Sequence, residues 1–126
     1  MEALSQRIDS YLSWNSVKKL LADTYAGRPR AEVAARFMEV ADSLASTFPE
    51  TDLEGLRFVS TPGRSELGGN HTDHNLGCVV AASIELDALA AVVPTDKPRI
   101  RLRSKGFDPL FEVSLDDLAP RPGAES

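Results

Sequence analysis

Apolar side chains near the N-terminus recur at the spacing of amphipathic helices. In residues 33–48 they fall every three or four positions, and Pro49, which lacks the backbone N–H that a helix interior needs, follows directly. The same spacing occurs in residues 13–25, where a glycine and a proline follow within four positions. The pattern therefore predicts two helices within residues 1–52, each with an apolar face that must be covered.

Beyond residue 52 the apolar residues come in short runs that are typical of strands. Residues 56–60 predict a first strand, and residues 78–82 predict a second one after a glycine-rich segment. Residues 84–93 continue the second run with acidic and apolar side chains in alternation, although their alanines also permit a helix. One strand therefore enters the glycine-rich segment and another leaves it.

The C-terminal third alternates charged and apolar side chains, which is the pattern of half-buried strands. Residues 99–104 place an arginine at every second position, and we expect these arginines to face solvent rather than bind phosphate. Residues 111–115 alternate in the same way after a turn and complete an antiparallel meander. The acidic residues at 116 and 117, followed by Leu118, indicate the start of another helix. We predict one α+β domain over residues 1–126, with the two helices packed on a mixed, largely antiparallel sheet over residues 56–118.

Composition limits the partners that the chain can have. It has 126 residues, of which 42% are hydrophobic, and this is enough for one folded domain with a core. The net charge of -5 and the scattered basic residues argue against nucleic acid. The sequence shows no signal-peptide pattern and no apolar run of membrane-spanning length, and its single cysteine, Cys78, fits a reducing compartment. We therefore expect a cytoplasmic protein with neither nucleic acid nor a membrane as its partner.

Residues 62–83 concentrate the polar groups that could form a ligand site. Four glycines, an arginine (Arg64), both histidines and an aspartate occur there between two apolar runs. Gly68 and Gly69 allow the backbone to approach a ligand or another chain segment closely. The side chains that follow supply donors and acceptors at the spacing of adjacent sugar hydroxyls, and a carboxylate can accept from two hydroxyls at once. The segment predicts a sugar site, and its candidate residues are Asn70, His71, Thr72 and Asp73.

Simpler roles for the same residues remain open at this point. His71, Asp73 and His74 have the residue types of metal ligands, but the sequence has no other histidine to complete a site, and we expect no metal. Asp73 could instead bond to its own backbone in a turn. Arg64 could form a surface ion pair, and the glycines could be ordinary turn residues.

The register of the segment resembles a known family signature. Pro-Gly-Arg at residues 62–64, then a leucine, and then Gly-x-His-Thr-Asp-x-Asn-x-Gly at residues 69–77 are similar to the signature of galactokinases, which are sugar kinases of the GHMP superfamily. The wider resemblance covers residues 56–118. It implies a partial GHMP-kinase N-terminal domain from an enzyme that transfers the ATP γ-phosphate to the anomeric hydroxyl of galactose.

The resemblance also implies roles for individual residues. Arg64 matches the arginine that is regarded as a transition-state stabiliser in these kinases, where its charge offsets the charge that develops during phosphoryl transfer. The substrate-binding segment of the family matches Asn70, His71, Thr72 and Asp73. The resemblance therefore implies that these four residues bind galactose and that Arg64 acts in catalysis.

Three positions depart from the usual pattern of the family. This chain has Glu66 where the family usually has asparagine, Asn70 where it has glutamate, and His74 where it has tyrosine. Asn70 keeps one acceptor oxygen, loses the negative charge and gains two donors. We therefore expect a different sugar affinity or preference, while the spacing on both sides of these positions is intact.

The nucleotide-binding parts of the family have no counterpart in this sequence. ATP and Mg²⁺ are implied for the full-length family, whose second phosphate loop is rich in glycine and serine and whose catalytic aspartate comes from a later segment. Beyond Gly77 the chain has only Gly106 and Gly123, and no serine run follows either of them. We expect no cofactor to bind to this chain alone, and we expect galactose and a C-terminal kinase part as its partners. Two other hypotheses remain open, a non-catalytic sugar sensor or regulator and a truncated fragment without a function of its own.

Overall fold

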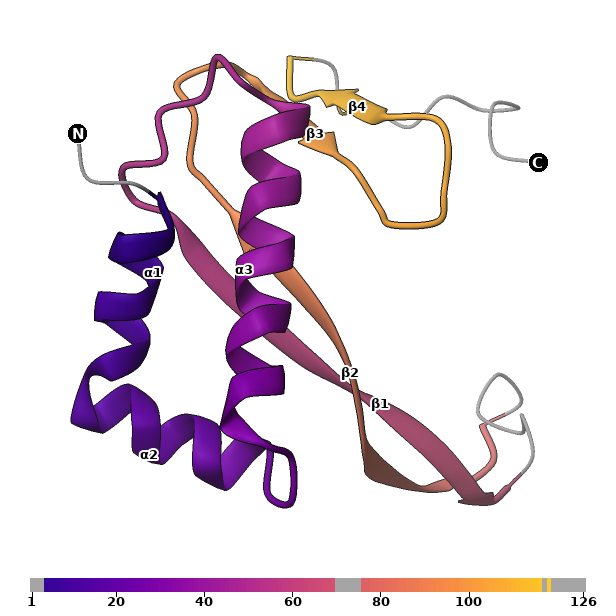
Figure 1. Ribbon diagram of the computed structural model, residues 1–126. Coiled ribbons are helices and arrows are strands. Elements are labelled where there is room, and N and C mark those ends of the chain that lie inside the picture. The colour runs from indigo at the N-terminus through magenta and orange to yellow at the C-terminus, as the bar shows by residue number, and fades with distance from the viewer. Residues whose placement is uncertain (1–3, 70–75, 117, 119–126) are drawn as a thin grey trace.

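The computed structural model describes residues 4–69, 76–116 and 118, and its helices and strands confirm the predicted α+β class (Figure 1). Helices come first along the chain and strands follow. The described strands form two separate antiparallel hairpins, β1 with β2 and β3 with β4, rather than one mixed sheet. The elements are α1 (Leu4–Ser13), α2 (Asn15–Thr24), α3 (Arg30–Thr47), β1 (Arg57–Gly68), β2 (Val80–Val92), β3 (Arg99–Leu102) and β4 (Phe111–Ser114).

The structure contains one helix that the sequence pattern does not predict. The two predicted helices correspond to α2 and α3, whereas α1 is only 10 residues long and has a short apolar face. Ile8 and Leu12 lie one helical turn apart on that face, and both are buried. Trp14 follows α1 in an extended conformation and separates it from α2. The chain therefore has an additional short helix, α1, before the first predicted one.

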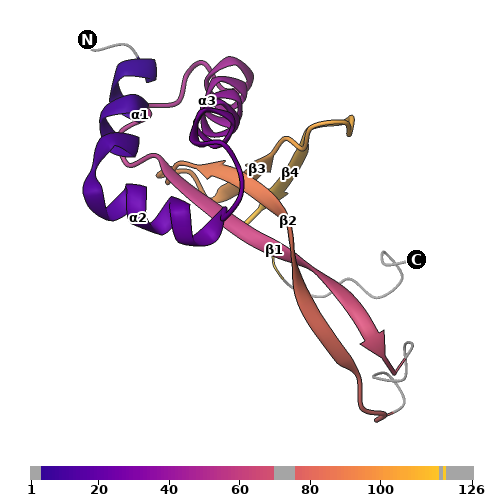
Figure 2. The same ribbon diagram turned by 60° about the horizontal axis from the view of Figure 1, so that its bottom comes forward.

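The core lies between the helices and one end of the β1–β2 hairpin. Phe58 of β1 and Leu89 of β2 pack against buried side chains from all three helices. The ring of Phe37 lies 4.9 Å from the ring of Phe58 and 6.3 Å from that of Tyr25, the latter edge-on. Figure 2 shows the helices over this end of the hairpin, while its other end extends away from them. The buried side chains of this cluster are Ile8, Leu12, Val17, Tyr25, Val33, Phe37 and Ala41.

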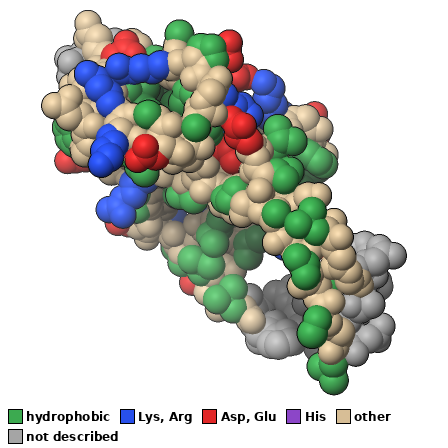
Figure 3. Space-filling model, turned by 90° about the horizontal axis from the view of Figure 1, so that it is seen from below, with side chains coloured by type: hydrophobic (Ala, Val, Ile, Leu, Met, Phe, Trp, Pro, Cys, Tyr) green, Lys and Arg blue, Asp and Glu red, His purple; other side chains and the backbone are tan. Residues whose placement is uncertain are grey.

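The β1–β2 hairpin is longer than its predicted strands. The first strand, predicted at residues 56–60, continues to Gly68 and so includes Arg64. The two apolar runs after the glycine-rich segment form a single strand, β2, so the helical alternative for its alanine-rich part is wrong. The pairing of β1 with β2 has two irregularities, and one of them lies between Pro62 and Arg64. The extended part of the hairpin exposes apolar side chains, and Figure 3 shows hydrophobic groups gathered on the surface at this end of the molecule.

One arginine of the β3–β4 hairpin, Arg101, faces the protein, and the prediction that it faces solvent is wrong. This side chain pairs with Glu50, and its guanidinium carbon lies 4.5 Å from the centre of the Phe48 ring. The opposite face of the hairpin is apolar, and Ile100 and Leu102 on it are 56% and 54% exposed. The inversion arises because charged and aromatic groups after α3, rather than an apolar surface, hold this hairpin.

The final described residues test the predicted helix start only in part. Asp116 lies in a bend and Leu118 has no regular structure, while Asp117 lies outside the described residues. None of the helices in the described ranges combines the length and the apolar character needed to cross a membrane.

Candidate functional site

Arg64 lies on β1, in the part of the hairpin that extends beyond the helices. It is opposite Ser83 of β2, directly after a register irregularity. Its side chain is exposed, and no side chain in the described part of the chain pairs with it. The surface ion pair considered as an alternative is therefore not found among these residues. Arg64 is thus an exposed residue close in sequence to the predicted sugar segment, and its role in catalysis stays a prediction.

The other predicted site residues lie outside the described residues. These are Asn70, His71, Thr72 and Asp73, and His74 lies outside them as well. Galactose binding by the first four residues therefore stays a prediction, as does the question of a metal at His71, Asp73 and His74. Among the residues that are described, no three His, Cys, Asp or Glu side chains are grouped so that they could hold a metal ion.

Gly69 shows why a glycine is needed where the chain enters the predicted sugar segment. Its φ of +106° lies in the left-handed region that favours glycine. A Cβ atom at this residue would lie 2.6 Å from the carbonyl oxygen of Cys78 and 2.7 Å from the Cα of Val79. At the adjacent Gly68, by contrast, nothing lies within 4 Å of the same position. The chain thus passes directly against the backbone that leaves the segment, and this contact brings the two ends of the segment together.

Gly63, in the Pro-Gly-Arg motif, is packed against the opposite strand. A Cβ atom here would lie 3.0 Å from the carbonyl oxygen of Leu86 and 3.2 Å from Cγ1 of Ile84. The strands change register at this point, between Pro62 and Arg64, and a glycine in a strand commonly marks such a close approach. The motif therefore places Arg64 after a local irregularity rather than in a regular ladder.

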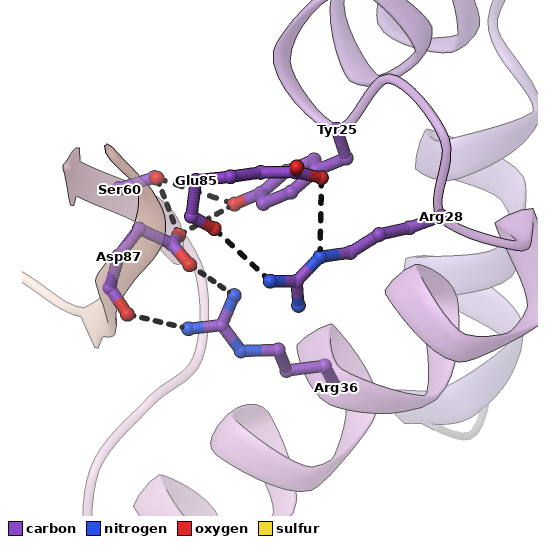
Figure 4. Close-up of polar contacts among 6 residues, drawn as sticks. All are labelled: Tyr25, Arg28, Arg36, Ser60, Glu85 and Asp87. Atoms are coloured by element: carbon purple, nitrogen blue, oxygen red, sulfur yellow. Dashed lines mark hydrogen bonds and ion pairs between the residues drawn. The ribbon is translucent and has the colours of Figure 1, made fainter. Parts of the chain in front are cut away.

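An acidic residue with a largely covered side chain, 8% exposed, lies at the base of the extended hairpin, where the sequence pattern predicts no site. The carboxylate of Asp87 on β2 accepts hydrogen bonds from the hydroxyls of Tyr25 (2.8 Å) and Ser60 (2.6 Å) (Figure 4). It also forms an ion pair with Arg36 of α3. A second nitrogen of Arg36 donates to the backbone oxygen of Asp87 at 2.9 Å. We call these four residues the Asp87 cluster; it connects the end of α2, α3 and both strands of the hairpin.

The surroundings of Asp87 favour its ionised form. Burial raises the pKa of Asp87, but hydrogen bonds from Ser60, Tyr25 and Arg36, together with the charge of Arg36, lower it by more, from 3.8 to about 2. Burial also raises the pKa of the Tyr25 hydroxyl, which therefore remains a hydrogen-bond donor at neutral pH. The cluster is thus ionic at neutral pH. No local sequence pattern indicates it, because Asp87 alternates with apolar residues in the same way as the exposed Glu85 of the same strand.

A cavity of about 350 Å³ lies beside the Asp87 cluster, between the helices and the hairpin. Its walls are mostly apolar and include Leu20, Phe37 and Ile84, while Tyr25, Ser60 and Asp87 supply polar groups. These polar groups already bond to one another. The end of the hairpin that carries Arg64 therefore remains the candidate functional site.

Sequence similarities point to the same hairpin. Residues 45–94, which include β1, β2 and the predicted sugar segment, match the family model described as the galactokinase galactose-binding signature. The galactokinase of Bacillus subtilis (strain 168) is 39% identical over 82 residues, which cover 64% of this chain and 20% of that relative. The galactokinase of Lactococcus lactis subsp. cremoris (strain MG1363) is 32% identical over 88 residues, or 67% of this chain and 22% of the relative. The galactokinase of Candida albicans is 32% identical over 66 residues, or 52% and 12%. No solved structure matches.

The hairpin carries a segment, residues 45–94, that matches the galactose-binding signature of galactokinases. The chain is similar to the N-terminal portion of galactokinases from bacteria and a yeast. It spans about a fifth of the length of the bacterial relatives that it matches.

Proposed function

We propose that this chain is the sugar-recognition part of a galactokinase, an enzyme that phosphorylates galactose at its anomeric hydroxyl with ATP. The observation that carries the proposal is the match of residues 45–94 to the galactose-binding signature, combined with an exposed Arg64 on the hairpin that spans the match. In this proposal the segment at residues 70–73 binds the sugar hydroxyls. Arg64 stabilises the charge that develops as the phosphoryl group is transferred.

The proposal divides the work between this chain and a nucleotide-binding part. ATP and Mg²⁺ belong to the second part, because phosphoryl transfer depends on groups that hold the phosphates, and this sequence has no second glycine- and serine-rich loop. We therefore expect the chain alone to bind sugar weakly and to transfer no phosphate. A cytoplasmic location is part of the same proposal, and the single cysteine supports it.

The apolar face of the β3–β4 hairpin supports the existence of a second part. Ile100, Leu102, Phe111 and Val113 share this face, and each is about half exposed. An apolar face of this kind commonly marks a surface that another element covers. The matched relatives are about five times as long as the region that matches this chain, and so we infer that the remainder of a galactokinase polypeptide occupies this face.

Sugar binding can be measured directly on the chain by NMR titration with galactose. For a monosaccharide of about twelve heavy atoms, at roughly 0.3 kcal/mol per atom, the free energy of binding is about 4 kcal/mol, which corresponds to a Kd near 1 mM. We expect Asp73→Ala to weaken binding and Arg64→Ala to leave it nearly unchanged, because Arg64 acts on the transition state. Absence of binding at about 50 mM galactose, some fifty times the expected Kd, would refute the proposal. Micromolar affinity would refute the expectation that this chain alone contains an incomplete sugar site.

A second candidate function is a non-catalytic sugar sensor or regulator. A sensor would bind a partner protein only in the presence of galactose and would consume no ATP. Mixing the chain with a galactokinase C-terminal part separates the two functions, since only the first predicts that phosphorylation of galactose is restored.

A further inference from the structure

The Asp87 cluster lies where the helices stop supporting the β1–β2 hairpin. Asp87 is the direct cross-strand neighbour of Pro62, the first residue of the Pro-Gly-Arg motif. The next paired residue on β1 is Arg64, beyond the register irregularity. From there the hairpin is exposed and extends away from the helices (Figure 2). Beyond Asp87, Arg28 in the loop between α2 and α3 donates to the backbone oxygen of Glu85 at 3.0 Å and pairs with its exposed carboxylate. Asp87, whose side chain is 8% exposed, is thus the better shielded of these two contacts near the candidate site.

The bonds of Asp87 fix the hairpin in more than one direction. Arg36 contacts both the carboxylate and the backbone oxygen of Asp87, so that one guanidinium holds the side chain and the strand together. Tyr25 approaches the carboxylate from the end of α2, and Ser60 approaches it from the neighbouring strand. The Asp87 side chain is only 8% exposed, so these interactions are weakly screened by water. Apolar contacts in the core are less directional and do not set an angle in this way.

A small rotation at this point has a large effect at the end of the hairpin. The strand rises about 20 Å from Pro62 to Gly68, and a rotation of about 10° at the base therefore displaces the end by about 3.5 Å. Misplacement by about 1 Å is enough to lower the rate of an enzyme about a hundredfold. The function of the hairpin is therefore sensitive to the angle at which it leaves the helices.

We propose that Asp87 and Arg36 are positioning residues that fix the angle of the β1–β2 hairpin, and with it the location of Arg64 relative to the helices. The part of this inference that concerns sugar rests on the proposed function. The part that concerns the hairpin angle stands on the geometry of the cluster alone.

The hairpin angle can be measured by electron-spin distance measurements between two nitroxide labels. One label is placed on Val80→Cys at the far end of β2 and the other on Asp42→Cys on α3, in a Cys78→Ser background, and the label positions are exposed. We expect a narrow distance distribution for this protein and a distribution at least twice as wide when Asp87→Asn is added. If Asp87→Asn leaves the width unchanged, the proposal is wrong.

A matched control separates positioning from loss of stability. Val33→Ala removes a buried side chain of the helical core and leaves the Asp87 cluster intact. At equal fractions of folded protein, Val33→Ala is expected to keep the narrow distribution, and equal broadening by both variants would also overturn the proposal. Should Asp87→Asn fail to fold, Ser60→Ala removes a single bond to the carboxylate and is expected to broaden the distribution to an intermediate width. An unchanged width in Ser60→Ala would then count against the proposal.

Galactose titration adds a functional readout. Asp87→Asn is expected to weaken galactose binding at least fivefold at a temperature where it remains folded, while Val33→Ala leaves the affinity unchanged. If the unsubstituted chain binds no galactose, the sugar-recognition proposal fails and the distance measurement still decides the hairpin angle. If that chain binds galactose and Asp87→Asn binds it equally well, the positioning role in sugar binding is refuted.

Discussion

Replacing Asp87 by asparagine should change how the stability of the protein depends on pH. The native structure lowers the pKa of Asp87 from 3.8 to about 2, because the bonds and the charge around the carboxylate outweigh the effect of its burial. A carboxyl group with a lower pKa in the folded state stabilises that state fully at pH values above its unfolded pKa. This stabilisation is lost as the pH falls from about 5 to about 2.

The size of the effect follows from the two pKa values. The difference between 3.8 and about 2 corresponds to about 2 kcal/mol of folding free energy, and the 8% exposure of the side chain leaves little screening by solvent. At pH 7, Asp87→Asn is therefore expected to lower the free energy of unfolding by about 2 to 3 kcal/mol, since it also weakens the pairing of Arg36. At pH 2 to 3 the variant and the unsubstituted protein should differ much less.

Urea denaturation followed by far-ultraviolet circular dichroism at a series of pH values measures this difference. The control is Glu85→Gln, which removes the charge of a 58% exposed side chain on the same strand that pairs with Arg28. Such an exposed pair contributes about 0 to 1 kcal/mol, and so the control should keep the acid dependence of the unsubstituted protein. The reasoning is refuted if Asp87→Asn loses as much stability between pH 5 and pH 2 as the unsubstituted protein does.

Three further predictions concern the glycines, the core and the exposed face. Gly69→Ala should destabilise the protein by about 1 to 3 kcal/mol in urea denaturation and weaken galactose binding, because a Cβ would lie 2.6 Å from the Cys78 oxygen. The control, Gly68→Ala, should change the free energy of unfolding by less than about 1 kcal/mol, because nothing lies within 4 Å of a Cβ there. Equal effects of the two variants would contradict the geometry. Phe37→Ala should cost about 3 to 5 kcal/mol in the same assay because its ring is buried against Phe58, while the exposed Phe107→Ala should cost less than about 1 kcal/mol. The exposed apolar face of the β3–β4 hairpin should cause the chain to self-associate, and the double variant Leu102→Thr/Val113→Thr should reduce this association in sedimentation velocity without a large loss of stability. Equal association of the double variant and the unsubstituted chain would show that this face does not mediate association.

The sequence predicts elements well where a long apolar face repeats, and less well where an element is short. α3 has several turns of regular spacing, so that its position is evident from the order of its residues alone. α1 has only Ile8 and Leu12 as buried residues, which is too little pattern to separate a helix from the start of the next one. The alternation in β3 correctly predicts which residues share a face. It cannot predict which face is covered, because Glu50 and Phe48, which hold Arg101, come from a distant part of the chain.

The candidate site, too, can be predicted from the sequence only in part. The register of the glycine-rich segment is enough to indicate a galactokinase signature, and the matched family model supports it. The Asp87 cluster is invisible to any local pattern because its other members lie 27 to 62 positions from Asp87 along the chain. Only the packing of helices on the hairpin brings Tyr25 and Arg36 to the carboxylate.

The location of the core in the sequence has a consequence for the synthesis of the protein. The buried apolar side chains of the described residues all lie between Ile8 and Phe48, and the partly buried Leu89 is the last residue that packs against them. N-terminal regions that contain their own core can fold while the ribosome is still adding later residues. The helices and the base of the hairpin can therefore form as soon as β2 has left the ribosome. The strands that enter and leave the sugar segment are then already paired when any later part of a kinase arrives.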